Sequence, residues 1–130
     1  MTTETLRPEL RWAIEAAQDK KAAGVTLLDL TGLGAFTEYF LVCTGFSTPQ
    51  VRAICDGIEE TLHKHGLRPM HREGRAGAEW LLLDYGGFIV HIFSERLRDF
   101  YNLERLWRQA RRIDFTEPGE DASAAGGRLT

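Results

Sequence analysis

Histidine and cysteine side chains are the first candidates for chemistry in this chain, because they ligate metals and act as bases or nucleophiles. His63 and His65 lie two positions apart in a predicted helix, so their side chains point in different directions, and His71 falls on another element. The sequence has neither an HExxH pattern nor a Cys/His cluster. Cys43 and Cys55 lie in apolar contexts without CxxC spacing, which is typical of buried thiols in a reducing compartment. We therefore predict no metal site.

A turn from a strand into a helix offers a second kind of chemistry. Ser47 follows Gly45 in this turn, as a nucleophile would in a G-x-S-x-G motif, but Pro49 occupies the last position of that pattern. A helix cap explains Ser47 more simply. Backbone donors at such a turn can also hold a phosphate, although the sequence has neither GxGxxG nor GxxxxGK[ST]. Nucleotide binding therefore stays open as an alternative.

The lack of paired carboxylates argues against nucleotidyl transfer. That reaction needs acids that hold metal ions over the phosphates, and these acids are often paired as DxD on a strand. Asp29 and Asp84 each stand alone in a predicted strand, without a second acid two positions away. We predict no catalytic residues and no cofactor, so the chain is expected to be a binding protein. An active nucleotidyltransferase remains the enzyme alternative.

The elements that position these side chains follow from apolar spacing and from caps. Residues 10, 13, 14 and 17 share one helical face, and residues 51, 54, 55, 58 and 62 share another. Gly86–Gly87 between two apolar runs predicts a hairpin. The predicted elements are a helix from Pro8 to residues 21–24, strands at 25–30 and 39–44, a helix from Ser47 or Thr48 to Gly66, a short strand within 67–73, hairpin strands at 79–85 and 88–93, a helix after Ser94, and a further turn or helix after Asn102.

This order predicts a single α+β domain, with a mixed β-sheet and helices packed on it. We expect the domain to span residues 8–113, between an N-terminal tail at 1–7 and a flexible C-terminal tail at 114–130. The apolar share of 43% and the charged share of 27% are those of a globular protein. No early segment combines basic residues with a long apolar stretch, so we expect a cytoplasmic protein without a membrane span.

Charge limits the kind of partner. The net charge of −3 argues against a protein that holds nucleic acid by bulk electrostatics. We therefore expect the chain to dock on a protein, or to contact nucleic acid through a local basic patch of its own. Residues 95–112 form such a patch, with a net charge of +3. A solvated helix face is the alternative interpretation of this stretch. The candidate contacts to RNA phosphates within it are Arg105, Arg108, Arg111 and Arg112.

The hairpin offers a candidate binding face. Strand alternation places Trp80, Leu82 and Asp84 on one face and Leu81, Leu83 and Tyr85 on the other. Both faces are mostly apolar, so one covers the core and the other meets a helix or a partner. Tryptophan is enriched at interface hot spots, although burial of Trp80 in the core is an equal alternative.

Three ordered segments resemble the Iojap-type family of ribosomal silencing factors. They are residues 16–60, which include LDL followed by FTEYFLVCTG, residues 79–93 (EWLLLDYGGFIVHIF) and residues 98–107 (RDFYNLERLW). The resemblance runs over residues 10–107. The chain departs from the family pattern at Gly87, where the family often has Asp, and at Pro49, where it often has Arg before Gln.

The resemblance implies a fold related to nucleotidyltransferases that lacks the catalytic acids. It also implies binding to ribosomal protein fourteen of the large subunit, at the intersubunit face, which blocks the small subunit and represses translation when nutrients are short. A large-subunit assembly factor, or less readily an active nucleotidyltransferase, is the alternative. A free apolar sheet face or hairpin edge also leaves open a homodimer when no ribosome is present. Tyr85 joins the expected docking face only if the strand bends at Gly86. The residues expected at this docking face are Pro69, Glu73, Gly74, Trp80, Leu82, Asp84 and Tyr85.

Overall fold

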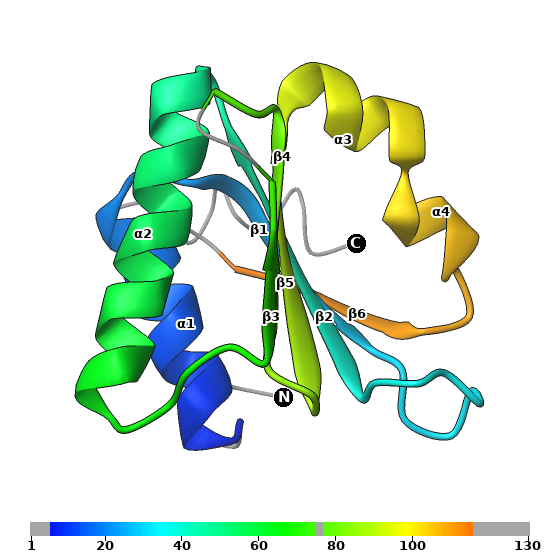
Figure 1. Cartoon of the computed structure of the whole chain (residues 1–130). Coiled ribbons are helices and arrows are strands. Elements are labelled where there is room, and N and C mark those ends of the chain that lie inside the picture. Colours follow the sequence, from blue (N-terminus) through cyan, green and yellow to red (C-terminus); the bar gives the residue numbers. More distant parts are fainter. Residues whose placement is uncertain (1–5, 75–76, 116–130) are drawn as a thin grey trace.

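The chain folds around one mixed β-sheet in the computed structural model, which describes residues 6–74 and 77–115 (Figure 1). The strand order is β3-β4-β5-β2-β1-β6, in which β2 and β5 are parallel and the other neighbours are antiparallel. The helices are α1 (Pro8–Asp19), α2 (Thr48–Lys64), α3 (Glu95–Tyr101) and α4 (Leu103–Leu106), and the strands are β1 (Ala23–Asp29), β2 (Tyr39–Gly45), β3 (His71–Glu73), β4 (Trp80–Asp84), β5 (Phe88–Ser94) and β6 (Arg111–Asp114).

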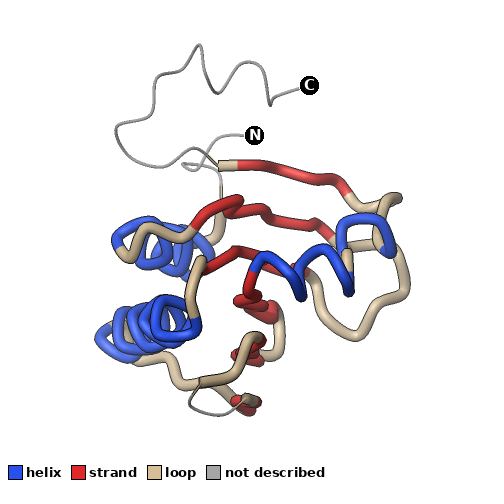
Figure 2. Tube along the Cα trace, turned by 90° about the horizontal axis from the view of Figure 1, so that it is seen from above, coloured by secondary structure: helices blue, strands red, loops and turns tan. Residues whose placement is uncertain are grey.

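Helices α1 and α2 cover one face of the sheet, as Figure 2 shows. Each begins with a proline in its first turn, where the missing N–H leaves no hydrogen bond unmade. Ser47 caps α2 by accepting a hydrogen bond from the Gln50 N–H over 3.1 Å, which confirms the predicted cap. The apolar stripes predicted for both helices are buried, and they pack on the strand residues Leu27, Leu41, Leu81, Leu83 and Val90 to form the main core.

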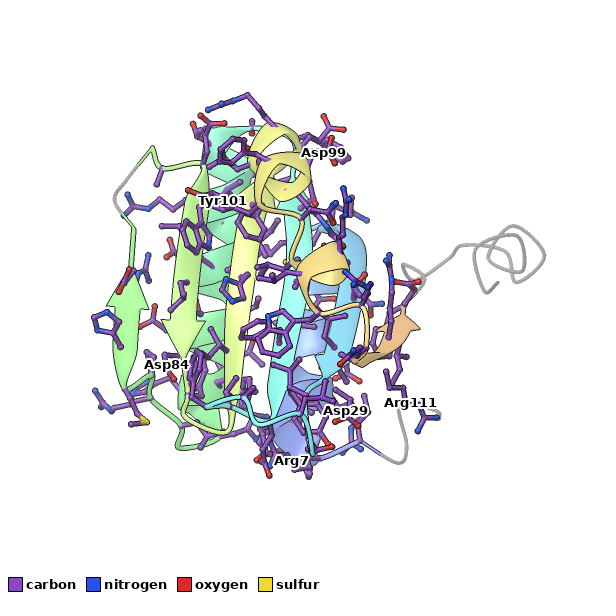
Figure 3. All side chains as sticks on the ribbon, turned by 90° about the vertical axis from the view of Figure 1, so that its right-hand side faces the viewer. Arg7, Asp29, Asp84, Asp99, Tyr101 and Arg111 are labelled. Atoms are coloured by element: carbon purple, nitrogen blue, oxygen red, sulfur yellow. The ribbon has the colours of Figure 1, made fainter. Side chains whose placement is uncertain are left out.

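Helices α3 and α4 lie on the opposite face. Ser94 caps α3, and Asn102 adopts a left-handed conformation (φ +44°) that turns the chain from α3 into α4. A smaller apolar cluster, which includes Phe40, Ile89 and Phe93, lies beneath them. The backbone of both helices lies over β5, β2 and β1 and not over β3 and β4, although the Tyr101 side chain of α3 reaches Trp80 on β4 (Figure 3).

The structure confirms the predicted α+β class with its mixed sheet, but it extends the domain at both ends. Leu6 is buried and Arg7 forms an ion pair with Glu38, so packing begins inside the segment predicted as a tail. At the other end, β6 was not predicted. It pairs with β1 and reaches Asp114, one residue past the expected boundary. Residues 116–130 of the tail predicted at 114–130 lie outside the described residues.

Within residues 6–74 and 77–115, none of the helices has the length and apolar character needed to cross a membrane.

The short strand predicted within residues 67–73 is confined to His71–Glu73, because Pro69 has no N–H to donate to a ladder.

Candidate docking surface

The uncovered part of the sheet gathers side chains from β3, β4 and β5 on one face. Residues that lie directly opposite each other in a ladder point to the same side of a sheet. Leu82 lies opposite Glu73 on β3 and opposite His91 on β5. We call the four exposed or half-buried residues that the sequence placed here the docking surface; they are Glu73, Trp80, Leu82 and Asp84.

Trp80 is half-buried and is held by an aromatic cluster. Its ring centroid lies 5.5 Å from that of Phe93 and 5.0 Å from that of Tyr101. Its indole Nε1 donates a hydrogen bond to Nδ1 of His91 over 3.2 Å. The ring therefore packs against the smaller core cluster and still reaches solvent, which combines the two alternatives that the sequence left open.

His91 was not singled out from the sequence. Its side chain is 6% exposed, and desolvation lowers its pKa from 6.5 to about 4, so the ring is neutral near pH 7. Because Nδ1 accepts from Trp80, the proton resides on Nε2, which is buried and has no hydrogen-bond partner among the described residues. The ring meets that of Phe40 at 82° and 4.7 Å. The sequence signal that could have identified His91 is a single polar residue at an inward position of the apolar run FIVHIF.

Two carboxylates flank the apolar centre of the docking surface. Asp84 accepts a hydrogen bond from the Gly86 N–H over 2.8 Å, so one of its oxygens fixes the hairpin turn. Glu73 is exposed, and its Oε2 lies 2.7 Å from Nε2 of His71. The acids give this surface a negative rim that is accessible to basic side chains.

Tyr85 and Pro69 lie on the other side of the sheet, towards α2, although we expected them at the docking face. Tyr85 stacks on Phe88 with 4.9 Å between ring centroids and packs against the main core, where burial raises the pKa of its hydroxyl. The strand therefore does not bend at Gly86 to bring Tyr85 to the docking surface. Pro69 lines a cavity of about 500 Å³ beside Asp56 of α2.

Gly74 directly follows β3 at the border of the docking surface. Its φ of +109° is a conformation that residues with a Cβ rarely adopt. A Cβ at this position would lie 2.2 Å from Cδ2 of Leu81 and 2.8 Å from the carbonyl oxygen of Trp80. The close approach of β3 to β4 therefore requires glycine here.

The predicted basic patch divides between two elements. Arg105 and Arg108 lie on and just after α4, whereas Arg111 and Arg112 lie on the strand β6 and not on a helix. Arg112 donates to Asp114 over 3.1 Å. Arg111 is exposed, and Figure 3 shows it pointing away from the sheet edge.

Arg98 belongs to the same stretch of sequence but serves the fold. Its guanidinium donates to the carbonyl oxygen of Gly24, to the hydroxyls of Thr26 and Thr44, and to the carboxylate of Glu104. The side chain is 13% exposed, so this cation ties α3 and α4 to β1 and β2 and does not contribute to an open patch.

The turn between β2 and α2 uses its backbone donors internally. The Phe46 N–H donates to Oε1 of Gln50 over 2.7 Å, and the amide nitrogen of the Gln50 side chain donates to the carbonyl oxygens of Lys20 and Lys21. Ser47 and Gln50 thus satisfy donors that a phosphate would otherwise contact. This arrangement favours the helix-cap interpretation of Ser47 over a phosphate site.

The acids considered for metal chemistry lie apart. Asp29 is on β1 and Asp84 on β4, with β2 and β5 between them (Figure 3). Across the described ranges, no three or more His, Cys, Asp or Glu side chains gather as metal ligands. Cys43 and Cys55 are buried, and desolvation raises the pKa of Cys43 to about 12 and that of Cys55 to about 11. Both are therefore protonated and unreactive at neutral pH.

Comparisons of sequence agree with the resemblance. The family model described as "Ribosomal silencing factor during starvation" matches residues 3–128. A ribosomal silencing factor of Bacillus subtilis is 39% identical over 101 residues, which cover 78% of this chain and 86% of that protein. A chloroplastic Iojap protein of Arabidopsis thaliana is 32% identical over 117 residues, which cover 88% of this chain and 48% of that protein.

Solved structures share the fold. A crystal structure of a Chromobacterium violaceum protein superposes with a TM-score of 0.75 at 28% identity, covering 92% of this chain and 98% of that one. A crystal structure of a Bacillus halodurans protein gives a TM-score of 0.71 at 35% identity, covering 82% of this chain and 96% of that one.

Proposed function

We propose that this chain, which belongs to the ribosomal silencing factor family, binds the large ribosomal subunit and keeps the small subunit from joining it. Membership rests on the family model over residues 3–128 and on relatives that are matched over most of their length. It implies a role in translation regulation at the ribosome. The finer proposal is that the chain contacts ribosomal protein fourteen at the intersubunit face.

The observation that carries the proposal is the uncovered β3–β4 face. Trp80 and Leu82 lie there half-buried on β4, where the contact from α3 to the indole is made by the Tyr101 ring at its border. Interfaces place such apolar and aromatic anchors at their centre and polar groups at the rim. Glu73 and Asp84 provide that rim, and their negative charge complements a basic partner surface.

The proposed mechanism is steric exclusion. A protein bound at the intersubunit face occupies space that the small subunit needs, so each occupied large subunit is removed from the pool able to join. No bond is made or broken. Repression then depends on the free concentration of this protein relative to its dissociation constant, and a tenfold change in affinity corresponds to about 1.4 kcal/mol.

Co-sedimentation with separated ribosomal subunits tests this proposal. We expect the protein to sediment with the large subunit and not with the small one. Trp80→Ala and Leu82→Ala should each weaken binding, Trp80→Ala by about 30-fold, as is common for a hot-spot residue. Phe36→Ala is the matched control, because Phe36 is 80% exposed and lies on the loop between β1 and β2.

The outcomes separate silencing from a role in assembly. If the protein binds the large subunit and joining is unaffected, the protein is an assembly factor or docks elsewhere. If the protein binds and Trp80→Ala binds equally well, the docking surface is misplaced. If no binding to the large subunit is found, the proposed function is wrong.

A further inference from the structure

We propose that the surface formed by α3 and α4 binds an unpaired nucleotide of ribosomal RNA. This aromatic–arginine surface is defined by Phe100, Tyr101, Arg105, Leu106 and Arg108. The inference rests on the proposed docking to the large subunit, which brings this surface to RNA, and it adds a second contact of different chemistry.

The apolar members of this surface are unusually exposed. Phe100 is 74% exposed, Leu106 69% and Tyr101 45%. The rings of Phe100 and Tyr101 meet at 87° with 5.1 Å between centroids, so one ring braces the other. Neighbouring exposed aromatic and aliphatic side chains mark an interaction site more often than isolated ones do.

The turn between the two short helices shapes a hollow. Asn102, with a φ of +44°, turns the chain from α3 into α4, and its side chain accepts a hydrogen bond from the Arg105 N–H over 3.3 Å. The hollow has a volume of about 400 Å³ and is a shallow depression that is wide open to solvent. It is lined by the aromatic–arginine surface together with Asp99 and Asn102.

The charges at this hollow suit a phosphate on one side. Arg105 and Arg108 are exposed, and neither forms an ion pair within the described residues. Glu104 does not neutralise them, because its carboxylate is held by Arg98. Asp99 is the one acid lining the hollow and lies on α3, as Figure 3 shows, so the phosphate belongs on the α4 side beside the arginines.

This combination favours RNA over a protein partner. Unpaired bases stack on aromatic side chains and on guanidinium planes, while arginines contact the adjacent phosphates. A protein strand or helix would use the apolar side chains and leave two arginines to be neutralised. The surface is also continuous with the docking surface, because Tyr101 contacts Trp80 at 5.0 Å between ring centroids. A partner bound at Trp80 thus brings its neighbouring surface to α3 and α4.

Photo-crosslinking on the large subunit tests the inference. The photoreactive p-benzoylphenylalanine replaces Phe100 in the full chain, and the matched control carries it in place of Arg52, an exposed residue of α2 on the opposite side of the sheet. We expect a ribonuclease-sensitive crosslink from position 100 and none from position 52. A crosslink from position 100 to ribosomal protein alone, or none in a complex that still co-sediments, would overturn the RNA assignment and leave the proposed function intact.

Salt dependence of large-subunit binding provides a second readout. Arg105→Ala and Arg108→Ala should each reduce the slope of log affinity against log salt by about 1, because each removes one phosphate contact. Phe100→Ala should weaken binding by about tenfold, through loss of stacking. Arg52→Ala is the control for charge. Unchanged slopes in both arginine variants would contradict the inference. A failure of the unmodified chain to bind the large subunit would contradict the proposed function itself.

Discussion

The indole Nε1 of Trp80 and the Nδ1 of His91 lie 3.2 Å apart, in a hydrogen bond that links β4 to β5. The bond fixes one edge of the indole to a buried residue, the rings of Phe93 and Tyr101 pack beside it, and the tryptophan as a whole stays half-buried. An anchor whose rotamer is already fixed loses less conformational entropy when a partner binds. His91 therefore positions the central residue of the docking surface.

Protonation of His91 should destabilise the fold. Its pKa is about 4 in the folded protein and 6.5 in its ordinary state, so below pH 6.5 the unfolded chain binds a proton that the folded protein excludes. The stabilisation is fully present above pH 6.5 and is lost as pH falls towards 4. Between pH 7.5 and pH 5 we expect a loss of about 2 kcal/mol in the free energy of unfolding, measured with urea. The loss should be absent in His91→Phe, and an equal loss in that variant would assign it to other groups.

Trp80→Ala should remain folded. The indole is half-buried against Phe93, so its truncation should lower the free energy of unfolding by about 2 kcal/mol, less than for a fully buried tryptophan. Urea unfolding and circular dichroism measure this cost beside the affinity for the large subunit. If the variant is instead unfolded, Trp80 serves the core and its loss of binding carries no information about the interface.

Arg98→Ala should be strongly destabilising. The side chain is 13% exposed, and its removal leaves the carboxylate of Glu104, also 13% exposed, without its cation. We expect a loss of about 3–5 kcal/mol in the free energy of unfolding. Arg96→Ala is the matched control, because Arg96 pairs with Glu79 in solvent and its side chain is 71% exposed. Equal thermal stabilities for the two variants would contradict the structural role of Arg98.

Gly74→Ala should disturb the docking surface through the backbone. The added Cβ would collide with the Leu81 side chain and the Trp80 carbonyl oxygen, so β3 must move away from β4. We expect a loss of about 3 kcal/mol in stability and weaker binding to the large subunit. Gly77→Ala is the control, because Gly77 also has a positive φ (+82°) but no atom within 4 Å of the added Cβ. It should cost about 1 kcal/mol, and similar results for both variants would mean that strain alone matters.

Local signals account for what could be predicted from the sequence. The cap at Ser47 and the apolar spacing in residues 51–62 specify α2 without reference to the rest of the chain. The Gly86–Gly87 turn and strict alternation place Trp80 and Leu82 on one face. These features depend only on residues that are close together in the sequence, so they can be predicted without knowing the tertiary structure.

Non-local pairing accounts for what was missed. The residues of β6 follow a helical stretch and carry two arginines, and they form a strand only because β1 offers a free edge. Arg98 was counted in a surface patch, yet its partners Gly24 and Thr44 lie far away in the sequence. The position of Pro69 beside α2 likewise depends on how a loop crosses the sheet edge.

Subunit joining in the presence of increasing amounts of this protein tests the central claim most directly. Purified large and small subunits are mixed under conditions that favour joining, and the joined fraction is followed by sedimentation. We predict that the joined fraction falls in proportion to the large subunits occupied by the protein, and that Trp80→Ala requires about 30-fold more protein for the same effect. A joined fraction that stays constant while the large subunit is saturated would contradict the account.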